Sequence, residues 1–479
     1  MSSSRTGPVV VAGAVAGLAG VAVSQVLTVV LGVRVSPVLA VAEAVVELTP
    51  GPVAEVLISI VGTWDKPLLV GGVVLGVVAL VSLAGVLARR SVALANTLLL
   101  VMAVVALGAL VLRPGFSSVS VVPLAAGVAT WMVVLALLSD RAERAYAGPG
   151  PRPDAGAELG PQVDTAQPSP GASRRSFLAL AGAAAVVSVA GVAAAQLLSR
   201  GRRAVETSRR LLRLPAGRGV VPDGAELELP GLSPWRVPNE DFYRIDTALV
   251  VPAVDPSDWR LRIHGMVERE IVVTYADLLE RERTEAWVTL CCVSNEVGGD
   301  LIGNAYWSGV RVADLLAEAG VDPDADAVRQ TSEDGWNCGT PLTALTDGRD
   351  ALLAVAMNGE PLPLEHGFPV RMVVPGLYGF VSATKWLVDL EVTRFDRFTA
   401  YWTERGWSAQ GPVKTQSRIE VPGNGDDVPA GRVRVGGHAW AQHTGVEKVE
   451  VRVDGNAWTP AELGRVPSDD TWVQWAATV

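Results

Sequence analysis

The feature that most constrains the fold is a set of long, charge-free apolar runs, all of them within the first 200 residues. Each run holds at least 20 residues, enough for a helix at ~1.5 Å rise per residue to cross a bilayer. Inside lipid a spanning segment must be helical to satisfy its own backbone polar groups. Five membrane-spanning helices are therefore predicted, at residues 9–33, 68–88, 92–112, 119–138 and 177–198.

The stretch between the first two runs is different in character. Residues 37–60 carry Glu43, Glu47 and Glu55 among apolar neighbours. Acidic groups are costly in the middle of a bilayer. The pattern leaves two alternatives open, an interfacial helix or a re-entrant segment.

Composition excludes several classes of protein. A mean hydropathy of +0.32 with 19% charged residues is too apolar for an all-soluble chain, and 479 residues suggest about three domains. The net charge of −10 argues against a nucleic-acid partner. Three cysteines, two of them adjacent, cannot build a disulfide framework. The histidines all follow residue 260, so the apolar half cannot bind haem through two of them: His264, His366, His438 and His443.

Basic residues between the runs predict the orientation. One side of the membrane would hold the larger set: Arg5, Arg89, Arg90, Arg141, Arg144, Arg174 and Arg175. The other side would hold the smaller set: Arg34, Lys66 and Arg113. The N-terminus is therefore predicted to be cytoplasmic, with everything after residue 198 outside. One group opposes this orientation because it would also lie outside: Arg200, Arg202, Arg203, Arg209 and Arg210.

A twin-arginine pattern precedes the fifth run. It reads Ser173-Arg-Arg-Ser-Phe-Leu178 and is followed directly by apolar residues. This is typical of an export signal for a folded domain, although an ordinary basic flank of a spanning helix remains the alternative. The expected organisation is four helices in 1–140, a flexible cytoplasmic linker in 141–172 that is rich in Pro, Gly and Ala, and the motif with a fifth helix in 173–200.

After residue 219 the pattern changes to short β-like runs with Pro and Gly between them. Strands are predicted at 259–265 and 270–274 as a pair, and at 369–374 and 385–392. Helical spacing marks 276–283 and 312–319. Mixed elements in this order favour an α+β core over 219–397. Alternation at 431–440 and 446–453 predicts a separate strand-rich region over 413–479.

Two polar clusters stand out in this second half. Cys292 lies in Trp287-Val-Thr-Leu-Cys-Cys-Val-Ser-Asn295, a C-x-x-N pattern. His366 and Arg371 follow about seventy residues later in H-G-x-P-x-R, and Arg371 lies in a run that reads as buried. A buried guanidinium needs an anionic partner, and a soft thiolate suits a soft metal. The pattern therefore fits an anionic cofactor that carries a metal.

These motifs, with Gly379-Phe-Val-Ser-Ala-Thr-Lys-Trp386, resemble the molybdopterin-binding core of the sulfite oxidase family from about Asn239 onward. The resemblance implies that Cys292 is a sulfur ligand of molybdenum and that Cys291 is a packing residue. It implies pterin and phosphate contacts from a wider set: Asn239, Tyr243, Arg244, Thr331, Ser332, His366, Arg371, Ser382, Thr384 and Lys385. Trp307 matches an active-site tryptophan of the family, and a core role is the equal alternative. Cys338 has no assigned role.

The resemblance also implies an immunoglobulin-like dimerisation domain over 413–479, and hence a homodimer. Such a sandwich needs about seven strands in about 100 residues, and 67 residues remain from 413. We expect either a truncated domain or a sheet with an open edge.

The sequence departs from the family at positions that concern the substrate. Sulfite oxidases surround the metal with arginines, and two expected positions here hold Ile245 and Val297, with Glu296 adjacent. These residues would bind the sulfite dianion weakly. The resemblance and these departures together predict a membrane enzyme with an extracytoplasmic catalytic domain. It would transfer an oxygen atom to or from a small sulfur or nitrogen oxo compound, and sulfite dehydrogenase is the alternative.

Electrons would pass to or from a cytochrome or quinone, because the membrane half shows no redox centre of its own. Two readings from other classes remain. One is an extracytoplasmic cysteine acyltransferase with Cys292 as nucleophile and His366 as base, which would also need an orienting group and an oxyanion site. The other is a non-catalytic scaffold.

Overall fold

The computed structural model describes residues 7–146 and 200–479, apart from 34, 114–115, 215 and several positions between 51 and 63. From 147 to 199 it describes isolated positions. The twin-arginine motif, the fifth predicted span at 177–198 and nearly all of the predicted linker (141–172) therefore lie outside the described residues. The chain divides into two compact units, Met1–Arg200 and Gly201–Val479, and each is described by itself.

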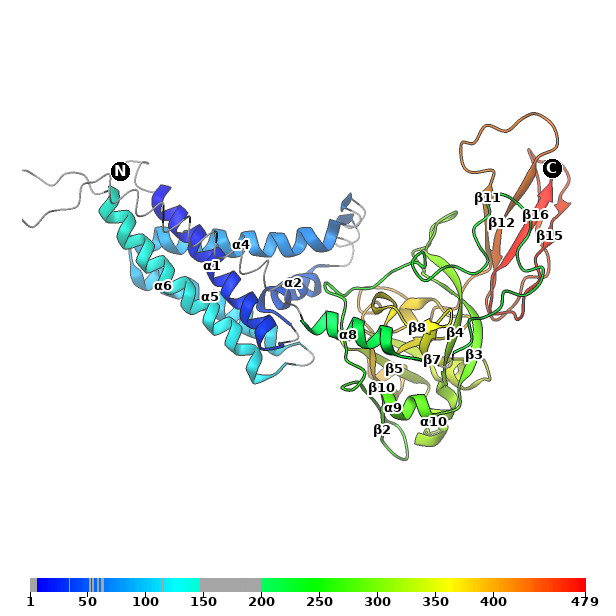
Figure 1. The fold of residues 1–479 in the computed structure, drawn as a ribbon, viewed down its shortest axis with the longest axis horizontal. Coiled ribbons are helices and arrows are strands. Elements are labelled where there is room, and N and C mark those ends of the chain that lie inside the picture. The colour runs from blue at the N-terminus through cyan, green and yellow to red at the C-terminus, as the bar shows by residue number, and fades with distance from the viewer. Residues whose placement is uncertain are drawn as a thin grey trace, which may run out of the picture. The chain divides into compact units, whose positions relative to one another are not determined.

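The first unit is helical (Figure 1). Its described elements are α1 (Gly7–Val30), α2 (Pro37–Leu48), α4 (Asp65–Ala88), α5 (Val92–Val111), the short 3₁₀ turn η3 (Ser118–Ser120) and α6 (Val121–Tyr146). Four helical segments are long and apolar enough to cross a membrane, at Gly7–Val30, Asp65–Ala88, Val92–Val111 and Ser118–Arg141. They coincide with the first four predicted spans.

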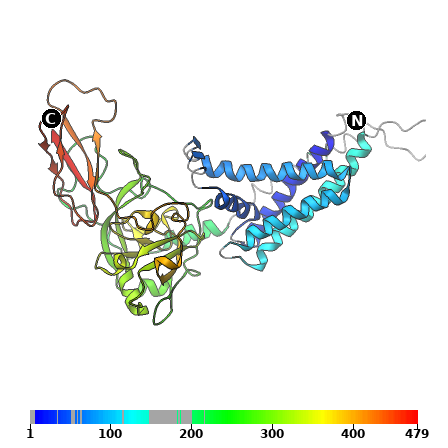
Figure 2. The same cartoon turned by 180° about the vertical axis from the view of Figure 1, so that it is seen from behind.

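Helix α1 is the inner helix of this unit. In its most apolar stretch 56% of the residues are buried, against 22–33% in the other three helices. It packs against α4 and α6 (Figure 2). Close approach depends on glycine, because a Cβ at Gly13 would lie 2.4 Å from the Ser82 backbone and one at Gly20 would meet the Trp131 ring. Small residues at helix contacts are the usual means of tight packing in membrane proteins.

Helix α2 forms the first half of the 37–60 stretch. It begins after Ser36, whose hydroxyl accepts a hydrogen bond from Leu39 N at 3.2 Å. Near its other end, the Glu47 carboxylate accepts two bonds from the Arg113 guanidinium at 2.8 and 2.7 Å, and Glu43 lies 3.4 Å from the same group. The acidic residues of α2 are therefore paired with a cation that follows α5.

The second unit contains two five-stranded sheets. The first sheet has the order β2 (Ile271–Thr274), β1 (Arg260–Gly265), β10 (Leu387–Thr393), β5 (Ala327–Ser332) and β6 (Asn337–Pro341). The second has the order β3 (Thr284–Cys291), β4 (Ile302–Arg311), β7 (Leu352–Met357) and β8 (Glu360–Pro361), with β9 (Arg371–Val373) also pairing with β7. The helices and turns are α8 (Arg200–Leu211), α9 (Tyr275–Glu280), α10 (Val312–Ala319), α11 (Leu342–Thr346), η4 (Leu364–His366), η5 (Gly379–Val381) and η6 (Phe395–Arg397).

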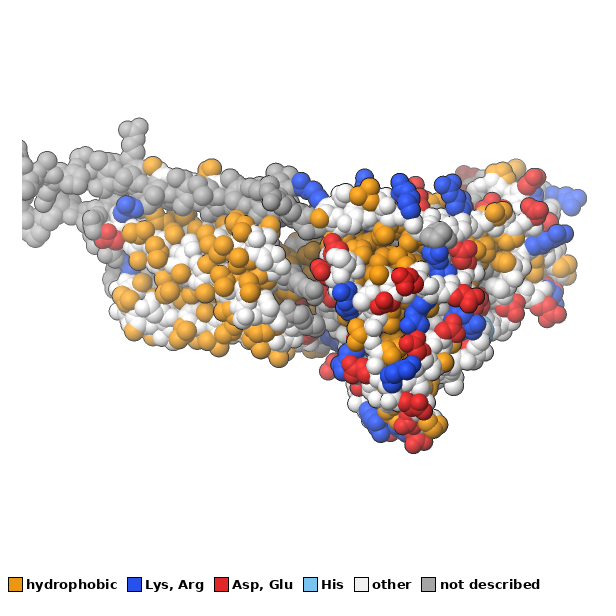
Figure 3. All heavy atoms as spheres, turned by 60° about the horizontal axis from the view of Figure 1, so that its bottom comes forward, with side chains coloured by type: hydrophobic (Ala, Val, Ile, Leu, Met, Phe, Trp, Pro, Cys, Tyr) orange, Lys and Arg blue, Asp and Glu red, His pale blue; other side chains and the backbone are white. Residues whose placement is uncertain are grey.

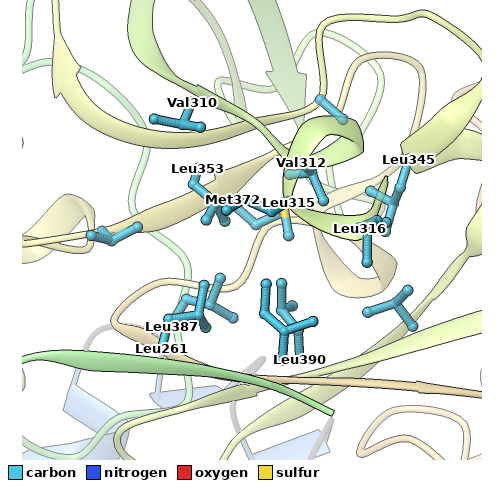
Figure 4. Close-up of a cluster of buried hydrophobic side chains, with 14 of the residues drawn as sticks. Leu261, Val310, Val312, Leu315, Leu316, Leu345, Leu353, Met372, Leu387 and Leu390 are labelled. Atoms are coloured by element: carbon cyan, nitrogen blue, oxygen red, sulfur yellow. The ribbon is translucent and has the colours of Figure 1, made fainter. Parts of the chain in front are cut away.

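The main core lies where one face of each sheet meets α10 (Figure 4). Leu261 and Leu390 from the first sheet point toward Leu353 and Met372 from the second, and Leu315 of α10 joins them. All five are completely buried. Burying one such side chain contributes about 1.5–3 kcal/mol, so this cluster fixes the two sheets relative to each other. The opposite face of the second sheet is left to carry other side chains.

Most local expectations for this unit hold. The predicted strand pair at 259–265 and 270–274 is confirmed as the antiparallel β1–β2 pair, and α10 occupies 312–319 as predicted. Helix α9 ends three residues early, at Glu280. The predicted α+β class is confirmed by these sheets and helices.

The C-terminal part of this unit forms a further sheet. Its strands are β11 (Gln416–Val421), β12 (Arg434–Trp440), β16 (Val473–Thr478) and β15 (Glu462–Leu463) in that order, with a separate pair of β13 (Glu450–Val451) and β14 (Thr459–Pro460). The long strand predicted at 446–453 is wrong, since only two of those residues are in a strand. Its alternating valines pack on the small core around Trp475 without a long ladder.

The surfaces of the two units differ in chemistry (Figure 3). Apolar side chains cover the visible face of the helical unit almost without charge, while acidic and basic side chains are spread over the other unit. An exposed apolar surface of this extent is characteristic of contact with lipid. The helical unit therefore has the surface expected of a membrane region.

Candidate active site

Strand alternation places Cys292 and Arg371 on the same face of the second sheet. Val288 and Leu290 of β3 lie in the core cluster on the face away from α10, and so does Val373 of β9. Side chains two residues apart in a strand share a face. Arg371 shares the face of Val373, and Cys292, the residue after β3, continues the parity of Leu290.

Tyr243 is close enough to both residues for their charges to affect its hydroxyl. Burial raises the pKa of its hydroxyl; the thiol of Cys292 raises it further, and the guanidinium of Arg371 lowers it. Its neighbour Phe242 stacks on it with ring centroids 5.2 Å apart and meets Trp307 edge-on at 5.7 Å. The segment that follows Asn239 therefore covers the face that carries both the thiol and the cation.

Cys292 is half-buried, and its sulfur faces hydrogen-bond donors. Burial raises the pKa of the thiol, while the N–H groups of Ser294 and Val293 and the hydroxyl of Ser294 lower it. The following loop closes on itself, since Cys292 N donates to Leu301 O and Leu301 N donates to Asn295 Oδ1, both at 2.9 Å. The loop therefore presents donors that would stabilise a thiolate.

Cys291 faces the other way, as predicted. It is 1% exposed and packs among Trp235, Trp440 and Trp472. Burial raises the pKa of its thiol to about 12. At neutral pH this group is a protonated packing residue, so the two adjacent cysteines have different environments.

Arg371 is a buried cation whose contacts are weak. Its N–H groups reach His366 O at 3.3 Å and Met372 O at 3.4 Å, and its Cζ lies 5.0 Å from the Trp307 ring centroid. Among the described residues no carboxylate forms an ion pair with it. Burial lowers its pKa to about 10. Gly367, at φ +106°, allows this packing, since a Cβ there would lie 2.9 Å from that of Arg371.

His366 is a neutral group held in one orientation. Its Nε2 lies 3.0 Å from Asn239 O, and a carbonyl can only accept, so Nε2 carries a proton. Burial lowers the pKa of His366 to about 4, helped by the charges of Arg371 and Lys385. The side-chain amide of Asn239 is itself bonded to Met357 O and Asn358. Asn239 therefore acts through its backbone carbonyl in this structure.

Lys385 forms a second cationic position. Its Nζ lies 3.0 Å from Asp246 Oδ2 and 3.1 Å from Glu365 O. Arg244 donates to the same Asp246 oxygen at 2.9 Å. Burial lowers the pKa of Lys385 to about 8, against the opposing effect of Asp246. Asp246 therefore joins two cations, which the sequence did not reveal.

Several predicted contact residues point into the protein instead. The hydroxyl of Ser382 donates to Tyr378 O at 2.9 Å, and that of Thr384 lies 3.4 Å from the sulfur of Cys338. Both side chains are completely buried. Cys338, which had no predicted role, therefore packs beside Thr384.

Thr331 and Ser332 are at the end of β5. Ser332 is buried. Burial is the largest effect on the pKa of the Asp334 carboxyl and raises it, the nearby hydroxyl of Ser332 lowers it, and Asp246 raises it further. This places Ser332 toward the Lys385 position. Between described residues, no hydrogen bond or ion pair links Thr331 to Cys292 or Arg371.

Trp307 is a core residue in this structure. Its side chain is 0% exposed, and its indole N–H donates to Val288 O at 3.1 Å. This burial favours the core alternative for Trp307, and the active-site role stays a prediction. Phe242, in contrast, was overlooked, although it directly precedes the predicted contact residue Tyr243 and meets His366 edge-on at 5.6 Å.

Comparisons with known proteins agree with this site. A family model described as oxidoreductase molybdopterin binding domain matches residues 248–402. The uncharacterized oxidoreductase YuiH of Bacillus subtilis (strain 168) is 35% identical over 157 residues, covering 33% of this chain and 76% of that protein. Mitochondrial sulfite oxidase of Mus musculus is 32% identical over 269 residues, covering 47% and 49%. This chain belongs to the sulfite oxidase family.

Within the sulfite oxidase family, the matched residues 248–402 form an oxidoreductase domain of the molybdopterin-binding type. The chain spans about half the length of the curated sulfite oxidases it matches. Among solved structures, the sulfane dehydrogenase SoxCD of Paracoccus pantotrophus matches with a TM-score of 0.42 and 27% identity, covering 48% of this chain and 65% of that one. A score at this level does not define a common fold.

The residues on this face fit the cofactor. Arg371 is a buried cation without a carboxylate partner among the described residues, and an anionic group would complete it. The sulfur of Cys292 faces N–H donors, as a metal-bound thiolate would require. No group of three or more His, Cys, Asp or Glu in the described parts of the chain could hold a metal ion. A metal here would therefore need ligands from the cofactor as well as from the protein.

Proposed function

We propose that this chain is a membrane-anchored molybdopterin-dependent oxidoreductase in which Cys292 is the sulfur ligand that the protein gives to molybdenum. The observation that carries the proposal is the shared face of Cys292 and Arg371, with Tyr243 within electrostatic reach of both. One end of this face offers a thiol among N–H donors, and the other offers buried positive charge. That polarity suits a cofactor with a metal at one end and a phosphate at the other.

The chain's own residues divide the work of binding. When bound, the molybdenum cofactor supplies the two-electron chemistry that moves an oxygen atom to or from a small substrate. Arg371 and Lys385 would neutralise the phosphate, and Arg244 would support them through Asp246. His366 would orient the pterin as a neutral imidazole. The remaining predicted contacts would act through backbone groups or by supporting these side chains: Asn239, Tyr243, Thr331, Ser332, Ser382 and Thr384.

The substrate proposal rests on the shortage of fixed positive charge at expected positions. Ile245 is 48% exposed and Val297 is 98% exposed. This exposure changes the argument for Val297, which was expected beside the substrate: it lines no pocket and is only a position without an arginine. We propose reduction of a small sulfoxide or N-oxide, which takes up two electrons and two protons and releases water. A quinol or a reduced cytochrome would supply the electrons, and sulfite dehydrogenase is the alternative.

The acyltransferase reading finds no support in the geometry. In a nucleophile–base pair the two groups must be hydrogen-bonded or close enough to form that hydrogen bond. The Nε2 of His366 is engaged by Asn239 O, and among described residues no hydrogen bond joins His366 to Cys292. With a pKa of about 4, His366 is also a poor base at neutral pH.

A matched pair of variants tests the ligand assignment. Cys292→Ser is expected to abolish activity and change the molybdenum spectrum of a folded protein, because it removes a thiolate from the metal. Cys291→Ser is the control, since that thiol packs on the other face, and it should retain both. Molybdenum content and electron paramagnetic resonance of the two purified proteins would be compared. Loss of the signal in Cys291→Ser alone would move the ligand by one residue.

A further inference from the structure

The C-terminal segment holds the strand that leads to Cys292. Strand β3 is an edge strand, and Thr289 on it bonds to the C-terminal segment at three places. Thr289 N donates to Asp470 O at 3.0 Å, its hydroxyl accepts from Trp472 N at 2.8 Å, and its carbonyl accepts from Gln442 at 3.1 Å. An edge strand otherwise presents unpaired backbone groups, so the C-terminal segment completes this edge.

The loop after Cys292 receives a bond from the same direction. Arg418 of β11 donates from Nη1 to Gly299 O at 2.6 Å. Gly299 lies in the loop that runs from Cys292 to Leu301, and the ends of this loop are tied to each other by the Cys292 N to Leu301 O bond at 2.9 Å. The Arg418 bond therefore adds a second attachment two residues before the point where the loop closes.

Arg418 is itself held firmly. Its side chain is 8% exposed and its Nε donates to Glu420 Oε1 at 2.6 Å. Glu420 also accepts from Ser233 N and lies 2.8 Å from His438 Nδ1. Burial alone would raise the pKa of Glu420, but His438, Ser233 N and Arg418 lower it to about 2. A permanently charged carboxylate thus orients the guanidinium, and the Trp472 ring lies 5.4 Å from it.

We infer that Arg418 is a positioning residue for the molybdenum site, which it serves by fixing the loop that presents Cys292. The inference rests on the proposed role of Cys292 as ligand. It gives the C-terminal sheet a part in the site, although none of its side chains belongs to the set predicted to contact the cofactor. A hydrogen bond from a charged guanidinium is about twice as strong as one between neutral groups, so its loss should affect the conformation of the loop.

The variants separate this contact from general stability. Arg418→Gln with Glu420→Gln removes the guanidinium without leaving its carboxylate partner buried and charged. Arg418→Lys keeps the buried ion pair, and hence the fold, but loses the fork that reaches Glu420 and Gly299 together. Arg434→Gln is the matched control, because Arg434 donates a similar bond to Glu228 O at 2.9 Å, away from the loop.

Two readouts are used on the full chain. The first is the alkylation rate of Cys292 by iodoacetamide in cofactor-free protein, read by fragment mass spectrometry, with hydrogen exchange of residues 292–301. The second is the molybdenum resonance spectrum of the loaded protein. The double variant should raise the alkylation rate at least about tenfold, equivalent to ~1.4 kcal/mol of loop opening, and should shift the spectrum. Arg418→Lys should lie between it and the parent, and Arg434→Gln should match the parent.

Parental alkylation in both Arg418 variants would overturn the inference. So would faster alkylation with an unchanged spectrum, because the contact would then be structural only. If the double variant does not fold, Arg418→Lys decides alone by the same criteria. The alkylation readout needs no metal, so a failure here is distinct from a failure of Cys292 ligation, which the Cys292→Ser spectrum reports.

Discussion

At the residue scale, the candidate site holds charged side chains in buried positions, which is unfavourable unless they have partners. Arg371 and Lys385 are buried deeply enough to lower their pKa values to about 10 and about 8, yet they differ in partners. Lys385 has Asp246 at 3.0 Å, whereas Arg371 has only carbonyls and the Trp307 face. An uncompensated buried charge destabilises a folded protein. Arg371 is therefore the residue whose retention most requires a ligand.

This difference predicts opposite effects of one substitution on two properties. A pKa lowered from 12.5 to about 10 means that burial costs the charged form on the order of 3 kcal/mol. Arg371→Met should therefore keep or raise the thermal stability of cofactor-free protein while cofactor retention collapses. Thermal unfolding and molybdenum content would be measured side by side. Lys385→Met is the contrast, expected to destabilise by removing the buried cation that pairs with Asp246 at 3.0 Å. A large stability loss in Arg371→Met would contradict this account.

Lys385 predicts a pH dependence of cofactor loading. Its ammonium is protonated below about pH 8 and becomes neutral above it, since burial favours the neutral form. A phosphate prefers the protonated form, so the loading rate of cofactor-free protein should fall as pH rises from 7 to 9. In Lys385→Gln this fall should disappear, leaving a lower and flatter profile. Loading would be followed by molybdenum uptake, and a parent profile that stays flat across this range would refute the assignment.

At the scale of elements, the local sequence pattern was sufficient to predict helices whose apolar residues are continuous or regularly spaced. The span-length apolar runs and the apolar spacing of α10 depend on nearby residues alone, and both were predicted from sequence. The sequence motifs suggested that Cys292 and Arg371 belong to one site. They did not predict that the two side chains lie on the same face of one sheet. This shared face depends on β3, β4, β7 and β9 lying in one sheet, and no local signal carries that order.

The features that the sequence did not reveal have the same origin. Trp307 was singled out because it matched a motif, and its burial depends on neighbours in space, Val288 and Phe242, that no local pattern reveals. Val446, Val449 and Val451 pack on the cluster around Trp475, and a long strand is not needed for that. Asp246 was overlooked because its two cationic partners become neighbours only after folding.

At the scale of the whole molecule, export and membrane insertion must be reconciled. The twin-arginine pattern suggests that the catalytic unit crosses the membrane after folding, which a cofactor inserted in the cytoplasm would require. Replacing Arg174 and Arg175 by lysine should leave the first four spans inserted and keep the catalytic unit in the cytoplasm. Protease accessibility from outside, compared with the parent, measures this. Equal accessibility would mean that an ordinary basic flank is the correct interpretation.

The substrate is also a property of the whole molecule, because it depends on the charge that the assembled site presents. Sulfite near neutral pH is largely dianionic and needs fixed cations in a partly desolvated pocket. Ile245 and Val297 stand where arginines are expected, and the exposure of Val297 shows that it contributes no lining at all. Losing a desolvated charge pair costs about 2–5 kcal/mol, or roughly 30- to 4000-fold in binding, whereas at a position as exposed as Val297 the loss is about 0–1 kcal/mol. Steady-state assays of the loaded enzyme should therefore show weak or absent sulfite oxidation and faster turnover of a sulfoxide or N-oxide.

Arg244 is the cation that could reverse this result, since its side chain is 43% exposed and only partly engaged by Asp246. A micromolar KM for sulfite that is lost in Arg244→Gln would establish the sulfite dehydrogenase alternative instead.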